Sequence, residues 1–373
     1  MKKTLYFLAI CLFFCNCTTN KLENGATIGK KPKNIILMIG DGMGVSQITG
    51  GLYMNNNKLY LEQFPFVGLH KNYPADKDLI IDSAAGATAF ACGCKTYNAA
   101  IAVKVDSTPC KTILEMAEEH GLATGLVATS SIEHATPASF IAHSKRRDDY
   151  ELIATYFTKT DIDLFIGGGK KYFDQRKSDT RNLYEELEKK NYQVSGVFKE
   201  ELKDISYSGK NLAYFTAIDH PVPVAQGRDY LPFASQFSVD FLKKKSNNKG
   251  FFLMIEGSQI DWGGHAGKTD YITSEMIDFD NAIGKVLDFA KKDGNTLVIV
   301  TADHETGGFA VLKGSKLGNI IGGFGDKMDE KTQNLYHTAS MIPVFAYGPG
   351  AENFSGIYEN TSIFDKMKRL FGF

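Results

Sequence analysis

Short apolar runs alternate with longer amphipathic stretches along most of this 373-residue chain. The runs are apolar at nearly every position, which is typical of strands buried on both faces of a parallel sheet. They span residues 34–39, 124–128, 251–255, 296–300 and 342–347. Helical patterns lie between them, at residues 85–94, 112–120, 148–159, 180–191, 234–244 and 271–292. This alternation predicts an α/β three-layer sandwich with a central, mostly parallel sheet between helices.

The N-terminus predicts a targeting segment. Lys2 and Lys3 give a positive start, and residues 5–14 are apolar but too short to span a bilayer. For residues 1–17 we weigh two interpretations, a lipoprotein leader that ends at Cys17 and simple cleavage of a signal peptide. Residues 18–33 predict a polar tether, and residues 34–373 show no internal linker and predict a single domain. We therefore expect an exported protein, periplasmic or attached to the outer membrane.

Composition narrows the class of protein. The formal net charge is −1 and no run of basic residues with interleaved aromatics occurs, which argues against nucleic-acid binding as the main function. Three cysteines lie beyond the leader, Cys92, Cys94 and Cys110. Buried free thiols are the default expectation. A bond between the first two is not expected two residues apart on a helix, while a bond from Cys110 to either stays open.

Polar residues follow several of the predicted strands. Asp41 lies two residues after the first strand, Glu256 directly follows the run at 251–255, and Asp303 and His304 follow the run at 296–300. Ligand groups gather at the carboxyl edge of open α/β sheets. A single aspartate there is often only a helix cap, but three strands that deliver such groups to one edge predict a binding site.

Ser83 opens a helical pattern of small residues. A helix N-terminus favours an anion, although a serine there is by itself most simply an N-cap. Asp261 and His265 are four residues apart and could reach one ion, as could Asp303 and His304. Carboxylate and imidazole ligands suit zinc, and two ions about 4 Å apart would clamp an in-line phosphoryl transfer. The pattern predicts a metal-activated serine that attacks a phosphoryl group.

Five segments, in order, resemble the alkaline phosphatase family over about residues 34–350. They are Asn34–Gly44 (NIILMIGDGMG), Asp82–Ala89 (DSAAGATA), His134–Ala138 (HATPA), Glu256–Asp261 (EGSQID) and Thr301–Gly308 (TADHETGG). The resemblance implies a central mixed sheet between two helical layers. It also implies hydrolysis of phosphate monoesters through a phosphoserine intermediate, with two Zn²⁺ and one Mg²⁺ per chain.

The resemblance also implies a role for each matching residue. Ser83 would be the nucleophile. One zinc would be held by Asp261, His265 and His337, the second by Asp41, Asp303 and His304, and the magnesium by Asp41, Thr136 and Glu256. An arginine should bind two phosphate oxygens through its planar guanidinium group. The spacing from His143 and to Tyr150 favours Arg147 over Arg146 for this role.

Two positions depart from the best-known bacterial pattern, which has a carboxylate where His134 stands and a lysine where Trp262 stands. The identity of the third metal beside His134 is therefore open, and we expect product phosphate to be held less tightly. Trp262 either forms part of the wall of the phosphate pocket or only packs against neighbouring side chains. The other histidines have no ligand context, and we expect them to be surface or packing residues; they are His70, His120, His143 and His220.

Three other functions compete with this one. The residues after Ser83 lack the proline and arginine of sulfatases. Diesterases of the same superfamily usually carry a threonine nucleophile and lack the third metal set, for which Thr136 and Glu256 are present here. A phosphodiesterase, or a non-catalytic phosphate-binding lipoprotein, remains the alternative. We expect small phosphate monoesters as substrates, and leave open a lipid anchor at Cys17 and whether the protein is a monomer or a homodimer.

Overall fold

The computed structural model describes residues 29–325, 329, 331, 332 and 334–373. Ten strands in this part of the chain form one sheet: β1 (Asn34–Gly40), β2 (Phe66–Lys71), β3 (Ala123–Ser131), β4 (Leu164–Gly168), β5 (Tyr192–Gly196), β6 (Asn211–Phe215), β7 (Phe251–Gly257), β8 (Thr296–Thr301), β13 (Ile342–Tyr347) and β14 (Gly356–Glu359). Their order is β14–β2–β13–β8–β1–β7–β3–β4–β6–β5. Two short ribbons stand apart, β9 (Glu305–Thr306) with β12 (His337–Thr338) and β10 (Phe309–Val311) with β11 (Gly322–Phe324).

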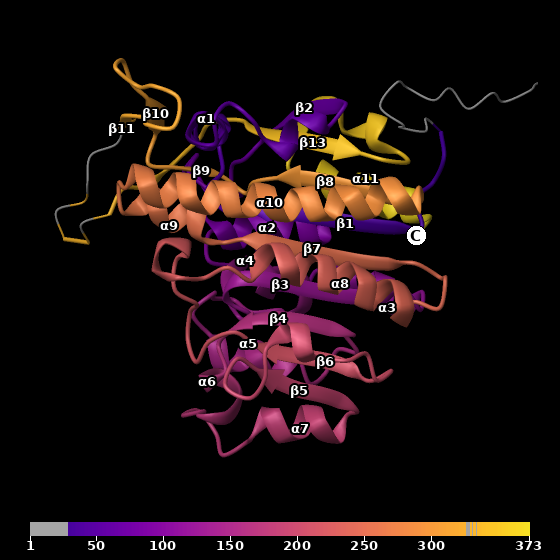
Figure 1. The fold of residues 1–373 in the computed structure, drawn as a ribbon. Coiled ribbons are helices and arrows are strands. Elements are labelled where there is room, and N and C mark those ends of the chain that lie inside the picture. The colour runs from indigo at the N-terminus through magenta and orange to yellow at the C-terminus, as the bar shows by residue number, and fades with distance from the viewer. Residues whose placement is uncertain (1–28, 326–328, 330, 333) are drawn as a thin grey trace, which may run out of the picture.

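Helices cover both faces of the sheet (Figure 1). They are α1 (Val45–Met54), α2 (Ser83–Cys92), α3 (Ile113–Glu119), α4 (Ala135–Ile141), α5 (Tyr150–Tyr156), α6 (Lys171–Asp174), α7 (Leu183–Lys189), α8 (Leu231–Lys245), α9 (Gln259–His265), α10 (Thr269–Asp293) and α11 (Ser362–Phe371). Short 3₁₀ turns are η1 (Tyr60–Gln63), η2 (Leu202–Asp204), η3 (Val224–Gln226) and η4 (Ala351–Phe354). The predicted three-layer α/β sandwich is confirmed.

The side chains of β1 show why the sheet needs two helical layers. Ile35, Leu37 and Ile39 belong to the core under α2 to α7 and α11, whereas Ile36 and Met38 belong to the core under α8 to α10. All five are completely buried. Because neighbouring residues of a strand point to opposite faces, a strand covered on both sides must be apolar throughout. This burial on both faces explains why the predicted strands appear in the sequence as continuous apolar runs.

The strand prediction is right for the centre of the sheet but wrong about the direction of one strand, β13. β1 pairs in parallel with β7 and β8, and β3 pairs in parallel with β7 and β4. β13 was expected to be parallel, but it runs antiparallel to both β8 and β2. The antiparallel pairing follows from the course of the chain, which the local pattern of residues does not encode. The five strands that the pattern did not predict, β2, β4, β5, β6 and β14, lie toward the two edges of the sheet.

Helix α2 is built to pack closely. All ten of its residues are buried. A Cβ atom at Gly86 would come within 2.9 Å of the Cβ of Asp303, so only glycine lets the helix approach the end of β8 this closely. The helix was predicted to run to residue 94 but ends at Cys92, because Gly93 adopts φ +67° in the left-handed region.

The early end of α2 changes the cysteine chemistry. Cys94 lies off the helix and forms a disulfide with Cys110, while Cys92 is a buried free thiol. The default expectation of free thiols is therefore wrong for two of the three residues, and the alternative bond from Cys110 is confirmed. The bond closes a loop with a sequence separation of 16 residues.

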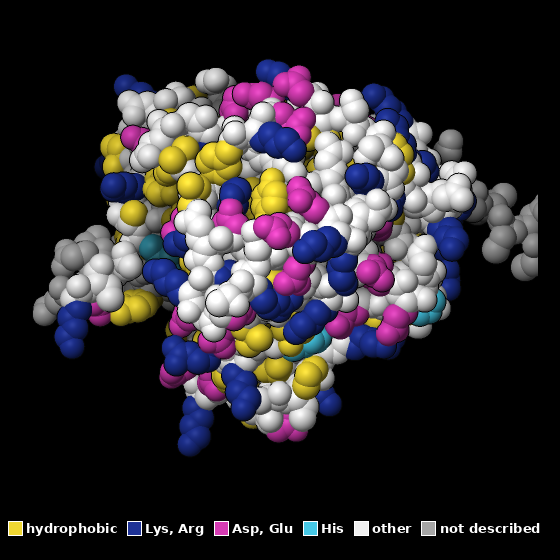
Figure 2. Space-filling model, turned by 90° about the horizontal axis from the view of Figure 1, so that it is seen from below, with side chains coloured by type: hydrophobic (Ala, Val, Ile, Leu, Met, Phe, Trp, Pro, Cys, Tyr) yellow, Lys and Arg dark blue, Asp and Glu magenta, His cyan; other side chains and the backbone are white. Residues whose placement is uncertain are grey.

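On the face seen in Figure 2, basic side chains are interspersed with acidic ones. No helix in the described part of the chain is both long and apolar enough to cross a bilayer. The predicted leader and the first part of the tether lie outside the described residues, as Cys17 does.

Candidate active site

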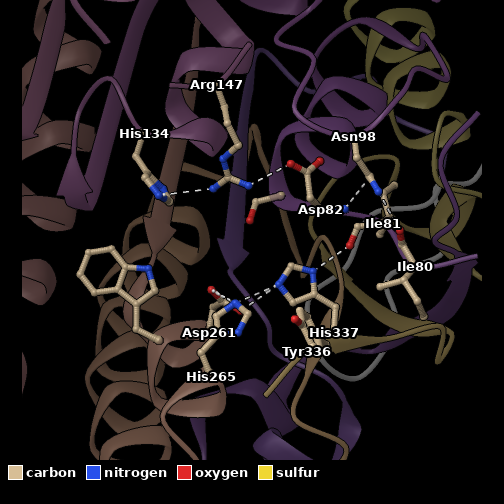
Figure 3. A pocket seen from close by; sticks show the side chains of 12 residues that line it. Ile80, Ile81, Asp82, Asn98, His134, Arg147, Asp261, His265, Tyr336 and His337 are labelled. Carbon is tan, nitrogen blue, oxygen red and sulfur yellow. Dashed lines mark hydrogen bonds and ion pairs between the residues drawn. The ribbon is translucent and has the colours of Figure 1, made fainter. Parts of the chain in front are cut away.

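A pocket of about 400 Å³ opens beside the start of α2, at the carboxyl edge of the central strands (Figure 3). Loops after β1, β3 and β8, the strand end of β7, helix α9 and the ribbon strand β12 all meet there. Predicted site residues line it, namely Ser83, His134, Arg147, Asp261, Trp262, His265 and His337. The other predicted residues lie buried beneath the pocket, namely Asp41, Thr136, Glu256, Asp303 and His304. The topology thus brings together residues that are up to about three hundred positions apart.

Ser83 is the first residue of α2 and does not act as its cap. Asp82 takes that place, since its Oδ1 accepts a hydrogen bond of 2.9 Å from the backbone N–H of Ala85. This leaves the hydroxyl of Ser83 free of a capping role. Its Oγ lies 3.2 Å from Nε2 of His304. The positive end of the helix dipole is at the same place and favours a negative charge beside the hydroxyl.

One group of potential metal ligands comes from α9 and β12. Asp261 and His265 are one helical turn apart, and Oδ2 of Asp261 lies 3.3 Å from Nε2 of His265. Nε2 of His337 lies 3.5 Å from Oδ1 of Asp261 and 3.1 Å from Nε2 of His265. Although burial opposes it, the two imidazoles hold the pKa of Asp261 well below its usual range. Three ligand atoms therefore converge on one point.

The backbone fixes the tautomers of these two histidines. Nδ1 of His337 lies 2.8 Å from the carbonyl oxygen of Ile81, and Nδ1 of His265 lies 2.5 Å from that of Leu335. A carbonyl oxygen only accepts, so each Nδ1 carries the proton in a neutral ring and each Nε2 presents its lone pair to the pocket. Such orientation by a backbone partner is typical of histidines that bind metals.

A second group lies directly under Ser83. Nε2 of His304 is 3.4 Å from Oδ1 of Asp41 and 3.4 Å from Oδ2 of Asp303. All three side chains are fully buried. Burial and the charge of Asp303 raise the pKa of Asp41 well above its usual value, and burial and Asp261 raise the pKa of Asp303 to about 6. Burial also lowers the pKa of His304, which keeps that imidazole neutral.

A third group lies behind the second, toward α4. Ligand atoms of Asp41, Glu256 and His134 lie within 4.8 Å of one another. Thr136 is buried in the first turn of α4, and its hydroxyl acts to lower the pKa of Glu256. Burial outweighs this effect and raises the pKa of Glu256 to about 8. His134 therefore belongs to this cluster by position, together with the three residues that the family resemblance implied.

The three groups fit metal cations. Among the described residues, neither carboxylate oxygen of Asp41 accepts a hydrogen bond, and the same holds for Oε1 of Glu256 and Oδ2 of Asp303. Buried carboxylates without donors are costly unless a cation compensates their charge. Carboxylates with neutral imidazoles are ligands that zinc takes in proteins, and an all-oxygen set suits magnesium.

The two candidate arginines lie in different surroundings. Nη1 of Arg147 donates to Oδ2 of Asp82 at 3.0 Å, and its Nη2 lies 3.4 Å from Nε2 of His134, inside the pocket (Figure 3). Although burial opposes it, Asp82 raises the pKa of Arg147, so the guanidinium stays charged. The side chain of Arg146 is 70% exposed and pairs with Asp148. Only Arg147 lines the pocket.

Sequence reasoning missed His220. Its ring packs on Trp262 with centroids 5.0 Å apart and on His134 at 5.6 Å, and its Nδ1 accepts from the N–H of Ser131 at 3.0 Å. It thus behaves as a packing residue, as expected, but it packs against the wall of the pocket, which nothing in the sequence predicts. No spacing in the sequence links residue 220 to the other site segments. The remaining three behave as packing or surface residues: His70 is buried, His143 pairs with Glu115, and His120 is exposed.

Two residues that the sequence pattern did not predict, Thr306 and Asn98, also hold the site in place. Thr306 donates to Oδ1 of Asp261 at 2.5 Å and lies 3.3 Å from Nδ1 of His304. Its one hydroxyl therefore joins a ligand of the first group to a ligand of the second. Asn98 accepts from the N–H of Asp82 at 2.9 Å and donates to the carbonyl of Ile80 at 2.9 Å, which fixes the loop before Ser83.

Comparisons with known proteins agree on one family. Residues 32–332 match the alkaline phosphatase family profile. The chain is 36% identical to alkaline phosphatase 3 of Bacillus subtilis, with 89% of this chain and 87% of that protein covered. It is 32% identical to the alkaline phosphatase of Escherichia coli, with 92% and 87% covered.

Solved structures give the same result. The alkaline phosphatase from the Antarctic bacterium TAB5 is 45% identical, covers 91% of this chain and 98% of its own, and superposes with a TM-score of 0.84. A histidine-to-glutamate variant of that enzyme is described with Mg bound in its M3 site. The fold, the convergent groups around Ser83 and these matches lead to one conclusion. The chain belongs to the alkaline phosphatase family and is an enzyme that hydrolyses phosphate monoesters.

Proposed function

We propose that Ser83 is the nucleophile of this hydrolysis and that Arg147 binds the phosphoryl group. The observation that carries the proposal is the position of the Ser83 hydroxyl, 3.2 Å from Nε2 of His304, in the pocket that Arg147 and Asp261 also line. A phosphoryl group beside Ser83 would meet the charged fork of Arg147, whose geometry matches two phosphate oxygens. Asp82 holds that fork in place.

The reaction then runs in two displacements. Oγ of Ser83 loses its proton and attacks phosphorus, the ester P–O bond breaks, and the alcohol leaves with a proton. Water next attacks the phosphoserine, the Oγ–P bond breaks, and inorganic phosphate departs while Ser83 regains its proton. Arg147 neutralises charge on the phosphoryl oxygens in both steps, which are governed by positioning and electrostatics rather than by covalent work of other side chains.

We further propose two Zn²⁺ and one Mg²⁺ per chain. Asp261, His265 and His337 would hold one zinc; Asp41, Asp303 and His304 would hold the other; Asp41, Thr136 and Glu256 would hold the magnesium. When bound, the zinc ions would lower the pKa of the attacking hydroxyl and stabilise the leaving oxygen. The Mg described in the M3 site of the TAB5 variant supports a third metal site here.

The closeness of His134 to Asp41 and Glu256 makes zinc the alternative occupant of the third site. Trp262 stands where the best-known bacterial pattern has a lysine, so one cation fewer would face the product. We expect inorganic phosphate to be released more readily for that reason.

Metal analysis tests these assignments. Protein dialysed against zinc and magnesium should hold two zinc ions and one magnesium ion per chain by elemental analysis. His337→Ala should lose one zinc ion and most of the turnover of p-nitrophenyl phosphate, because it removes one ligand of a single site. His120→Ala is the control, since His120 is exposed and remote from the pocket. An unchanged metal content in His337→Ala would contradict the first assignment.

We propose in addition that the protein is exported, with lipid attachment at Cys17 or simple cleavage of residues 1–17. The disulfide between Cys94 and Cys110 supports an oxidising compartment, where such bonds persist. Mass spectrometry of the mature N-terminus in a bacterial host decides between the two forms. An N-terminus that still begins at Met1 would contradict both.

A further inference from the structure

The segment after β8 carries an acidic side chain, Glu305, that the proposed reaction does not use. Glu305 is only 5% exposed and does not line the catalytic pocket. Its Oε1 accepts hydrogen bonds from Nε2 of Gln47 at 2.6 Å and from the N–H of Phe309 at 3.0 Å. Its Oε2 accepts from the N–H of Gly308 at 3.2 Å and from Oγ1 of Thr338 at 2.5 Å. A buried carboxylate whose two oxygens both have donors is fixed in one position.

The donors to Glu305 come from three different parts of the fold. One lies on α1, two are backbone groups of the turn after β9, and one lies on β12. Gln47 on α1 also donates to the carbonyl oxygen of Thr306 at 2.9 Å. A Cβ atom at Gly44 would lie 2.5 Å from Cγ of Glu305, so α1 begins directly against this side chain. Glu305 therefore joins the segment after β8 to both α1 and β12.

The hydrogen bond from Thr338 lies next to a potential metal ligand, because Thr338 follows His337 in the chain. β12 is only two residues long, and its pairing with β9 places Thr338 opposite Glu305. The hydroxyl of Thr338 also lies 3.0 Å from Oγ of Ser340. Because a carboxylate only accepts, the single proton of the Thr338 hydroxyl goes to Glu305, and Ser340 donates to Thr338. The short ribbon is thus closed by a side-chain bond beside its backbone pairing.

The two proposed zinc sites depend on β12 to different degrees. Asp41, Asp303 and His304 are fully buried and lie outside β12. The side chain of His337 is 11% exposed and reaches the pocket from β12 itself. Its Nδ1 donates to the carbonyl oxygen of Ile81, which orients the ring (Figure 3), but the position of its backbone is set by the ribbon. A shift of β12 would therefore displace a ligand of one zinc and leave the ligands of the other in place.

We propose that Glu305 is a positioning residue for the zinc site that contains His337. Its hydrogen bond with Thr338 fixes β12 and so sets where His337 meets the two ligands on α9. This role rests on the proposed function, because it requires zinc at Asp261, His265 and His337. Loss of an outer partner of a metal ligand weakens metal binding by about 10-fold to 100-fold. Because this bond acts through the neighbouring residue, its loss should weaken one zinc ion by about tenfold.

Zinc affinity, measured by competition with a chelating dye, tests this role without turnover. Thr338→Val keeps the branched shape but loses the hydroxyl, so it should weaken by about tenfold the zinc ion that His337→Ala loses, and leave the other unchanged. Thr338→Ser keeps the hydroxyl and should retain both wild-type affinities. Ser340→Ala is the matched control, because it removes only the other partner of the Thr338 hydroxyl. Turnover of p-nitrophenyl phosphate by Thr338→Val should recover when the zinc concentration is raised.

A second variant tests the carboxylate itself. Glu305→Gln leaves one acceptor oxygen for donors that met two, so it should weaken the same zinc ion at least as much, and adding Thr338→Val to it should have little further effect. Thermal unfolding of the metal-free variants verifies that they are folded. Wild-type zinc affinity in Thr338→Val, or equal weakening of both zinc ions, would overturn the role of Glu305 alone. Failure of the wild-type protein to bind zinc would overturn the proposed metal sites and this role with them.

Discussion

Replacement of Arg147 by alanine gives a demanding test of the site, because its neighbour Arg146 provides a matched control. Arg147 is held by Asp82 inside the pocket, whereas the Arg146 side chain is 70% exposed. The two residues are adjacent and carry the same charge, so a long-range electrostatic effect would be similar for both. Of these two arginines, only Arg147 is placed to donate hydrogen bonds to a bound phosphate.

The expected magnitude follows from the contacts that are lost. The fork of Arg147 would donate two charge-assisted hydrogen bonds, each worth about 1.5–3 kcal/mol. The side chain is 22% exposed, so the lower value applies and the loss is about 3 kcal/mol in total. This corresponds to about a hundredfold decrease in kcat/KM. Arg147→Lys keeps the charge without the fork and should lose about tenfold.

The assay is the hydrolysis of p-nitrophenyl phosphate together with the inhibition constant of inorganic phosphate. In Arg147→Ala, kcat/KM should fall and the inhibition constant of inorganic phosphate should rise. In Arg146→Ala, both values should stay within about twofold of those of the wild type. Asp82 keeps its hydrogen bonds to the N–H groups of Ala85 and Ala99, so the start of α2 should survive, and thermal unfolding verifies this. A loss in Arg146→Ala as large as that in Arg147→Ala would refute the reasoning.

Three other predictions concern stability and metal binding. Cys110→Ala opens the loop closed through Cys94 and should lower the free energy of unfolding by about 3 kcal/mol in urea titrations; no change would contradict a formed disulfide. Burial raises the pKa of Glu118 to about 8, so the folded protein binds more protons than the unfolded chain and stability should fall as pH rises from about 5 to about 8. Glu118→Gln should flatten this fall in unfolding measured at several pH values, and an identical slope would count against the burial of its charge. Thr306→Val should weaken zinc binding by about tenfold or more in competition with a chelating dye, because Thr306 orients Asp261 and His304; wild-type affinity would exclude that role.

The sequence predicts the centre of this fold well and its periphery poorly, for a physical reason. β1, β7 and β8 are covered on both faces, so their composition alone marks them as strands. β5 and β14 lie at the two edges of the sheet and carry mixed residues, which give no such signal. The direction of β13 depends on how the chain returns to the sheet, and local residues do not record it.

The residues of the site also differ in how well the sequence pattern predicts them. Asp41, Glu256 and Asp303 are marked by their place at strand ends, and the position of Ser83 at a helix start is visible as well. His337 carries no such mark. It reaches the site because β12 pairs with β9, a contact between short segments that no periodicity reveals.

His220 was missed for a related reason. It meets Trp262 and His134 only after the chain has passed through three further strands of the sheet, β4, β5 and β6. Resemblance to a family implies ligands such as His337, but it gives no information on residues such as His220 that support the pocket without binding metal or substrate.

The most direct test of the account is to capture the phosphoryl group on Ser83. Metal-loaded enzyme is mixed with p-nitrophenyl phosphate, quenched in acid and digested, and the peptide that contains Ser83 is analysed by mass spectrometry, with Ser83→Ala treated in parallel. The account predicts one added phosphoryl group on Ser83 in the wild type, and loss of both the modification and most of the turnover in Ser83→Ala. A phosphoryl group on another residue, or full turnover by Ser83→Ala, would contradict it.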